Sequence, residues 1–136
     1  MSMSKSEREQ FLSDLHVGVL AVAVADGAGP LALPIWYSYE PGGAVTLTTS
    51  PGTRKVRAIE AAGRFSLCAQ DERPPYQYVT VEGPAVIGTA TRAERLAIAQ
   101  RYLGREEGEA FVGAQAEGTD SVVIRMTPEH WLSRGL

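Results

Sequence analysis

The chain has 136 residues, of which 44% are hydrophobic and 21% are charged, proportions that exclude wholesale disorder and suit one globular domain over residues 1–136. The net charge of −3 at pH 7 argues against a nucleic-acid partner, which would favour a basic excess. No apolar run reaches the roughly 18 residues of a membrane span, and the first ten residues lack the apolar core of a signal peptide. We therefore expect a cytoplasmic protein that binds neither a membrane nor nucleic acid.

A helix and three strands are predicted over the first part of the chain. Ser6 and Glu9 have the spacing of a capping box, and a short apolar stripe follows, which predicts an N-terminal helix. Residues 16–25, 31–40 and 44–49 are rich in β-branched or aromatic side chains and are separated by turns that contain Gly or Pro, so each is a predicted strand. Because the turns are short, we expect the three strands to pair as an antiparallel meander.

The second of these strands has two different faces. Pro34 has no backbone N–H, which predicts a sheet edge or a bulge. Side chains alternate along a strand, so Trp36 should face away from Tyr37 and Tyr39. One face is therefore expected to join the core, and the other to line a ligand pocket or a dimer interface.

A second helix and two further strands are predicted in the middle of the chain. Ser50 suits the N-cap of this helix, Pro51 its first position and Gly63 its C-terminus. The strands are expected over residues 64–70 and 76–90.

The last third of the chain mixes helices with one more strand. Gly83 and Pro84 predict a bulge or bend in the strand that precedes it. Thr91 and Glu94 form a second capping-box pattern, for a helix that ends at Gly104. Two elements are expected after it: a helix over residues 106–116 and a strand over residues 121–126 that continues past Pro128 to Trp131.

Six strands with three or four helices predict a mainly β protein of the α+β class. Strands lie near both ends of the chain and do not alternate with helices, which argues against a doubly wound parallel sheet. We predict a six-stranded antiparallel barrel with helices packed on its outside.

The most informative segment is residues 48–57, TTSPGTRKVR. Hydroxyl side chains end a strand, and a helix begins where Arg54 and Lys55 stand. A helix start offers unpaired N–H groups and a partial positive charge, so together with the Thr53 hydroxyl these cations would form a phosphate site. The residues alone leave a second interpretation open: a capped surface helix with solvated charges.

Four segments, in order, resemble the pyridoxamine 5'-phosphate oxidase-like split barrels, a family of flavin and deazaflavin oxidoreductases. The segments are PIWY at residues 34–37, Thr-Arg-Lys at 53–55, RFSL at 64–67 and YQYVTVEG at 76–83. In this family a strand ending in Thr precedes Ser/Thr-Arg-Lys, a short helix and a strand that reads Arg-Val-Ser-Leu. The resemblance covers about residues 6–90 and favours the phosphate-site interpretation.

The resemblance implies an FMN-binding type of split barrel that forms a homodimer, with two identical cofactor sites at the interface. Pro34, Ile35 and Trp36 would line the tricyclic ring of the cofactor. Gln77 and Tyr78 would approach the site from the partner chain. The phosphate would be held by the hydroxyl and cationic residues Thr49, Ser50, Thr53, Arg54 and Lys55, with Thr48 beside them.

The resemblance also bears on the cofactor and the reaction. The Arg-Leu-x-Pro run that holds substrate in true pyridoxamine 5'-phosphate oxidases is missing from residues 130–136 (HWLSRGL), which argues against that activity. Short members of the family include reductases that use coenzyme F-420, a deazaflavin with a phosphodiester and a polyglutamate tail. Arg54, Lys55 and Arg57, clustered beside the phosphate site, could serve both groups, while the residues alone favour Arg57 as a solvated helix residue. We expect an F-420-dependent reductase that transfers hydride to a small organic substrate, with FMN as the alternative cofactor.

Two further interpretations stay open: a non-catalytic carrier or sensor of the cofactor, and a structural dimeric barrel without one. No residue is assigned a catalytic role, since Tyr37, Tyr78 and water could each supply a proton. The only histidines, His16 and His130, and the only cysteine, Cys68, do not form a metal-ligand pattern, so no metal is expected.

Overall fold

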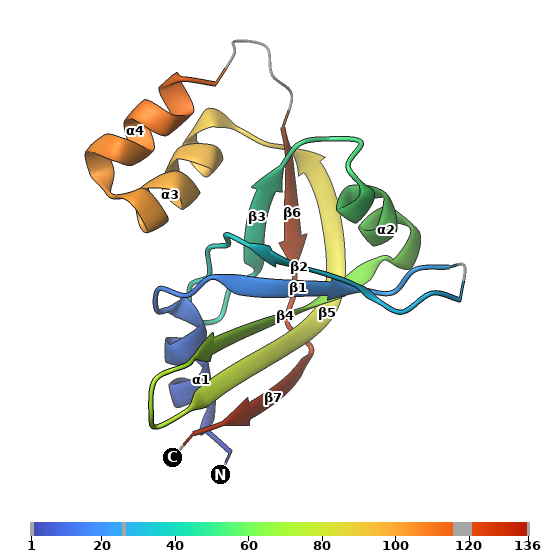
Figure 1. Cartoon of the computed structure of the whole chain (residues 1–136), viewed down its shortest axis with the longest axis vertical. Coiled ribbons are helices and arrows are strands. Elements are labelled where there is room, and N and C mark those ends of the chain that lie inside the picture. Colours follow the sequence, from blue (N-terminus) through green and yellow to red (C-terminus); the bar gives the residue numbers. More distant parts are fainter. Residues whose placement is uncertain (1, 26, 116–120, 136) are drawn as a thin grey trace.

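An antiparallel sheet curls into an open barrel with helices around it (Figure 1). This computed structural model describes residues 2–25, 27–115 and 121–135, and within them it has seven strands and four helices. The helices are α1 (Lys5–Ser13), α2 (Arg54–Ala62), α3 (Arg92–Leu103) and α4 (Arg105–Gly113). The strands are β1 (Gly18–Val22), β2 (Leu31–Ile35), β3 (Val45–Thr49), β4 (Arg64–Asp71), β5 (Gln77–Thr89), β6 (Val122–Met126) and β7 (His130–Arg134).

The strand order is β2-β1-β4-β5-β6-β3, with β7 paired to β5. All six predicted strands are present, and the antiparallel barrel is confirmed. The last predicted strand is divided into β6 and β7 around Pro128, because a proline cannot donate a backbone hydrogen bond to a neighbouring strand. Pro34 lies in β2, which is an edge strand as predicted.

The predicted meander is wrong at its third strand. β1 and β2 form an antiparallel pair, but β3 pairs with β6, and only the isolated bridge between Ser38 and Thr46 joins the segment after β2 to β3. The side chains of Tyr37 and Tyr39 are buried, so this segment enters the core after β2 ends at Ile35. The lengths of the turns do not reveal that β3 pairs with β6, because this pairing joins residues that are far apart in the chain.

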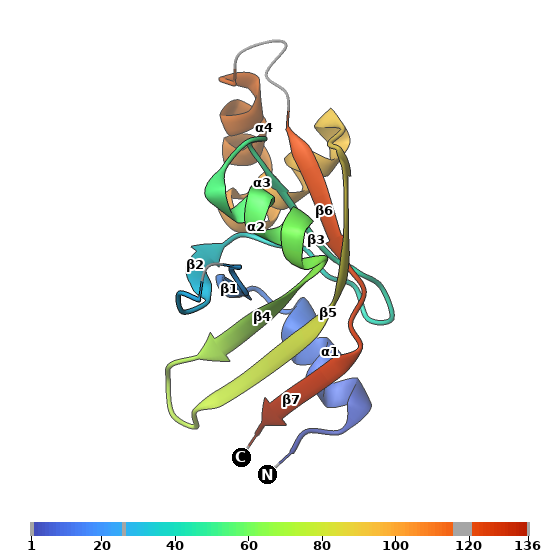
Figure 2. The ribbon, with the colours of Figure 1, turned by 90° about the vertical axis from the view of Figure 1, so that its right-hand side faces the viewer.

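Strand β5 is shared by two halves of the barrel (Figure 2). Its first part pairs with β4 and β7, and its second part pairs with β6. The predicted bend is confirmed at Gly83, where the link between β6 and β7 crosses β5. A Cβ atom added to Gly83 would lie 1.8 Å from the carbonyl oxygen of Thr127. The crossing chain is held by backbone hydrogen bonds from Thr127 to Pro84 (3.0 Å) and from Glu129 to Glu82 (2.8 Å).

The core fills the inside of the curled sheet. One row of paired residues crosses it from strand to strand, and α1 and α2 add buried apolar side chains. The row consists of Leu33, Leu20, Leu67, Val81 and Trp131. Leu20, Leu67 and Val81 are fully buried, and burying each such aliphatic side chain contributes about 1.5–3 kcal/mol to folding.

The opposite side of the same strands carries a row of small and apolar residues, which we call the open face. In register, it consists of Pro34, Val19, Cys68, Thr80 and Leu132. Val19 is 40% exposed and Leu132 is 61% exposed, although both lie in the sheet. No described element of the chain buries these two side chains.

Two helices begin at residues other than those expected from the sequence. Helix α1 begins at Lys5, and its capping box is formed by Ser4 and Glu7 rather than by Ser6 and Glu9. Helix α2 begins at Arg54 after Thr53, because Gly52, at φ = +73°, forms a turn that separates Ser50 and Pro51 from the helix. The capping box at Thr91 and the C-terminal position of Gly63 are confirmed. The predicted helix 106–116 corresponds to α4, and its last predicted residue lies outside the described residues.

Helices α3 and α4 lie together at one end of the molecule, away from β7 (Figure 2). Two neighbouring residues of α3 fasten it to the rest of the fold. The Tyr102 hydroxyl donates to the carbonyl of His16 (2.6 Å) and accepts from the N–H of Tyr37 (3.2 Å). Arg101 donates to the carbonyls of Ser13 (2.8 Å) and Asp14 (2.7 Å). These bonds set the distance between the helices and the β1–β2 edge. Separately, none of the described helices is long and apolar enough to cross a membrane.

Candidate functional site

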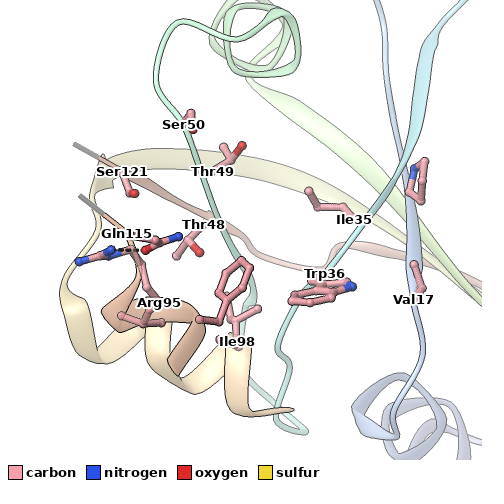
Figure 3. A pocket seen from close by; sticks show the side chains of 14 residues that line it. Val17, Ile35, Trp36, Thr48, Thr49, Ser50, Arg95, Ile98, Gln115 and Ser121 are labelled. Atoms are coloured by element: carbon pink, nitrogen blue, oxygen red, sulfur yellow. Dashed lines mark hydrogen bonds between the residues drawn. The ribbon is translucent and has the colours of Figure 1, made fainter. Parts of the chain in front are cut away.

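A cavity of about 400 Å³ lies between the barrel and the helix pair α3–α4 (Figure 3). Its volume is within the range of small-molecule sites. The strand wall consists of Val17, Pro34, Ile35, Trp36, Thr48, Thr49, Ser50 and Ser121. The helix wall consists of Arg95, Ile98, Ala99, Phe111, Val112 and Gln115.

Two segments predicted to bind the cofactor meet in the strand wall. These are the end of β2, with Pro34, Ile35 and Trp36, and the end of β3, with Thr48, Thr49 and Ser50. They meet because the chain beyond β2 folds inward and β3 then lies on β6. The hydroxyls of Thr48, Thr49, Ser50 and Ser121 make no hydrogen bond to any residue that the structure describes, so they are available to a ligand.

Trp36 forms an aromatic platform in this wall. Its ring stacks on Tyr102 with the ring centroids 4.8 Å apart and an angle of 9° between the planes. Phe111 of the helix wall lies 6.1 Å away at 48°. The alternation argument is confirmed, since Tyr37 and Tyr39 are buried in the core while Trp36 lines the cavity.

The predicted basic triplet lies next to the cavity and does not line it in the single chain. Thr53 is the N-cap of α2, but its hydroxyl donates to the carbonyl of Ser50 (3.2 Å) and does not cap the helix. Arg54 is exposed and Lys55 half-buried, and neither side chain has a hydrogen bond or ion pair within the described ranges. Arg57 is engaged differently, because its guanidinium donates to the carbonyl of Gly52.

Gln77, Tyr78 and Tyr37 stand apart from the cavity. Gln77 lies in a separate hollow beside Met3, and the ring of Tyr78 lies 5.9 Å from that of Tyr76. The Tyr37 hydroxyl is buried and donates to the carbonyl of Leu12 (2.7 Å). Burial raises the pKa of Tyr37, so this hydroxyl serves the core and is a poor source of a proton for a ligand.

Sequence reasoning missed the helix wall. Arg95 is half-buried, and its guanidinium donates to the side-chain carbonyl of Gln115. Helices α3 and α4 pack closely here, since a Cβ atom on Gly108 would lie 2.7 Å from the backbone of Gln100. The sequence signals a capped helix but not the surface on which that helix lies, and no motif distinguishes Arg95 from the other arginines of α3.

A second cluster, outside the cavity, gathers three side chains of the kinds that bind metals. Oxygen and nitrogen atoms of Glu82, Glu129 and His130 lie within 4.8 Å of one another. The guanidinium of Arg64 already forms ion pairs with both carboxylates and holds the pKa of Glu82 below its usual range. In the register of β4 with β5, Arg64 lies opposite Pro84 and Ser66 opposite Glu82. Arg64 and Glu82 are therefore diagonal neighbours on adjacent strands, which explains their ion pair.

Several known proteins share this architecture. The family model for pyridoxamine 5'-phosphate oxidase matches residues 4–135. No curated protein matches the chain significantly. A conserved hypothetical protein of Mycobacterium tuberculosis is similar with a TM-score of 0.76 and 24% identity, over 96% of this chain and 84% of that one.

Two similar structures have names that refer to cofactors. An F-420 reductase has a TM-score of 0.75 and 26% identity, over 91% of this chain and 94% of its own. An FAD-binding protein of Mesorhizobium loti has a TM-score of 0.70 and 21% identity, over 98% of this chain and 94% of its own.

These similarities confirm the split-barrel fold that the four sequence segments predicted. Since the family model extends over nearly the whole sequence, the chain belongs to the pyridoxamine 5'-phosphate oxidase family.

Proposed function

We propose that the protein is an oxidoreductase that holds coenzyme F-420 in the cavity, with FMN as the alternative cofactor, and reduces a small organic substrate. The observation that carries this proposal is the meeting of Pro34–Trp36 with Thr48–Ser50 in one wall, directly before the basic start of α2. The similarity to an F-420 reductase favours the deazaflavin over FMN.

The strand wall suits a tricyclic ring. Ile35 and Trp36 offer apolar and aromatic surface, and the stacking of Trp36 on Tyr102 keeps its ring in place. Pro34 has no N–H, so it presents apolar surface without an unpaired donor. When bound, the cofactor would supply the hydride, and these side chains would orient its ring and exclude water from one side.

The start of α2 suits an anion. Because the Thr53 side chain does not cap the helix, the first N–H groups of α2 remain free of a side-chain partner. Arg54 and Lys55 add two positive charges without partners among the described residues, and the free hydroxyls of Thr49 and Ser50 add donors. Phosphate takes donors of these kinds.

We also propose that two copies associate through the open face. Pro34 belongs both to that face and to the cavity, so a second copy on the face would close the cavity on this side. The open face carries exposed apolar side chains, as protein interfaces do. In such a dimer Gln77 and Tyr78 would approach the partner's cofactor, as the sequence resemblance implies.

Replacing both Arg54 and Lys55 with Ala tests the cofactor site. We expect the free energy of cofactor binding to weaken by about 3 kcal/mol or more, roughly 150-fold in Kd, because two charge-assisted contacts are lost. Binding is measured by titrating purified protein with F-420 and, side by side, with FMN, which have different visible spectra.

The matched control is Lys5→Ala with Arg105→Ala, which removes the same charge from exposed positions away from the cavity. Equal affinity in the two double variants would contradict the phosphate site. Wild-type protein that binds neither compound would contradict the proposed cofactor altogether. Binding without turnover of any acceptor would favour a non-catalytic carrier.

A further inference from the structure

We propose that the helix wall recognises the second molecule of the reaction, and that Arg95 makes the cavity selective for a planar organic anion such as an aryl or conjugated carboxylate. This inference rests on the proposed function, because it assumes that the strand wall is the cofactor side. It assigns a role to residues outside the four segments of the sequence resemblance.

The apolar part of the helix wall favours a flat ligand. Phe111 is 48% exposed although it is a large aromatic residue, and its ring lines the cavity 6.1 Å from that of Trp36. Ile98, Ala99 and Val112 are buried and line the same wall. Two neighbouring aromatic side chains with apolar support form a surface on which a planar hydrocarbon body packs better than a bulky or strongly polar one.

The opposite end of the cavity is cationic. Figure 3 shows Arg95, Gln115 and Ser121 at this end, and Trp36 with Val17 at the other. The carboxylates nearest in sequence are engaged elsewhere. Glu94 accepts from the N–H of Thr91 (2.9 Å) and pairs with Arg125.

The carboxylate of Glu109, which joins α4 to α3, is also engaged, because it pairs with Arg92 (3.3 Å). Arg95 therefore has no carboxylate partner among residues 2–25, 27–115 and 121–135; its partner there is the neutral side chain of Gln115. A half-buried cation without a counter-ion favours an anionic ligand, since that ligand would offset the cost of burying the charge.

Several hydrogen-bond donors converge beside this charge. The Gln115 carbonyl accepts from Arg95, which leaves the amide NH2 of Gln115 free to donate. The hydroxyls of Thr48 and Ser121 line the same end and make no bond to described residues. A carboxylate offers acceptors only, so it matches this set of donors.

Arg95 and the start of α2 would bind different anions. Arg54 and Lys55 lie beyond Ser50 at the start of α2 and do not line the cavity, whereas Arg95 lines it from α3. The two groups can therefore be removed separately by mutation.

The test compares 2-naphthoate with 2-naphthamide, which have similar shape but different charge. Binding of each is measured by calorimetry on the full-length protein, with and without saturating F-420. We expect wild-type protein to bind the anion about tenfold more tightly or better, a ratio typical of one charge-assisted contact. Arg95→Gln should abolish this preference, and Arg95→Lys should restore part of it by restoring the charge.

Two controls separate this inference from the proposed function. Arg92→Gln removes a neighbouring charge from α3 outside the cavity and should keep the full preference. The Arg54→Ala, Lys55→Ala double variant should lose cofactor affinity but also keep the preference. The role of Arg95 would be overturned if wild-type protein bound both probes equally or bound neither. It would also be overturned if Arg95→Gln protein kept the preference, or lost cofactor affinity instead.

Discussion

Tyr102 determines the position of the aromatic surface in the cavity although it does not line the cavity itself. Its hydroxyl bonds to the backbone of His16 and Tyr37, and its ring stacks on Trp36. A substitution that removes the ring would free Trp36 to adopt other rotamers. The shape of the strand wall therefore depends on a residue of α3 that has no place in the sequence motif.

Tyr37 gives a prediction on the pH dependence of stability. Burial raises the pKa of its hydroxyl above the ordinary value of 10.0, so the folded protein keeps this proton at pH values where the unfolded chain loses it. The stabilising contribution is fully present below pH 10 and declines as pH rises above it, by up to about 1.4 kcal/mol per pH unit. We expect the unfolding free energies of wild-type protein and Tyr37→Phe, measured in urea from pH 8 upward, to converge above pH 10.

The same variant should be less stable than wild type by about 1–3 kcal/mol near neutral pH, because the buried carbonyl of Leu12 loses its donor. Tyr76→Phe is the control: the Tyr76 side chain is 46% exposed, and among the residues that the structure describes its hydroxyl bonds only to the side chain of Gln70. A constant difference between wild type and Tyr37→Phe up to pH 11 would contradict the protonated, buried hydroxyl.

Strand β5 holds the two halves of the barrel together, and Gly83 is the point where its neighbour changes. The carbonyl of Thr127 occupies the space that any side chain at Gly83 would need. A substitution here must move one of two paired backbones, since backbone atoms cannot change rotamer as a side chain can.

We therefore predict that Gly83→Ala lowers the free energy of unfolding by about 3 kcal/mol or more. Gly88→Ala, in the same strand, is the matched control, because its Cβ atom would make an ordinary contact 3.8 Å from Val123. Chemical denaturation of both variants measures the effect. Similar stability of the two variants would show that the crossing chain is not fixed over Gly83.

At the scale of elements, local signals were predictable from the sequence and non-local partners were not. The capping box at Thr91 and the C-terminal Gly63 depend on a few neighbouring residues, and both were identified. The pairing of β3 with β6 depends on residues 73 to 81 positions apart, from Thr49 with Val122 to Val45 with Met126, and turn lengths favoured a meander instead. Six residues of the strand wall belong to segments that the motif had singled out, whereas Arg95 needed the placement of α3.

The whole molecule leaves apolar surface unburied on one side of its sheet. In the proposed dimer, Val19 and Leu132 would be buried against the second copy. We predict that Val19→Glu with Leu132→Glu raises the dimer dissociation constant about a hundredfold or more, because carboxylates would be forced out of water. Sedimentation velocity over a range of concentrations measures this change.

The control for that experiment is Val86→Glu, at an apolar residue that is 71% exposed and lies outside the open face. It should leave the dimer intact. A wild-type protein that stays monomeric at high concentration, or dissociation caused by Val86→Glu alone, would contradict the open face as the interface.

The walls of the cavity come from stretches of chain near residues 35, 49 and 95–115, which meet only in the folded protein. An unfolded chain therefore cannot hold the occupant, and any compound that fits must raise the melting temperature. At a concentration of a hundred times its Kd, such a compound adds about 2.7 kcal/mol, or several degrees for a domain of this size. Thermal melting against a panel of compounds can thus find the physiological occupant before any reaction is known.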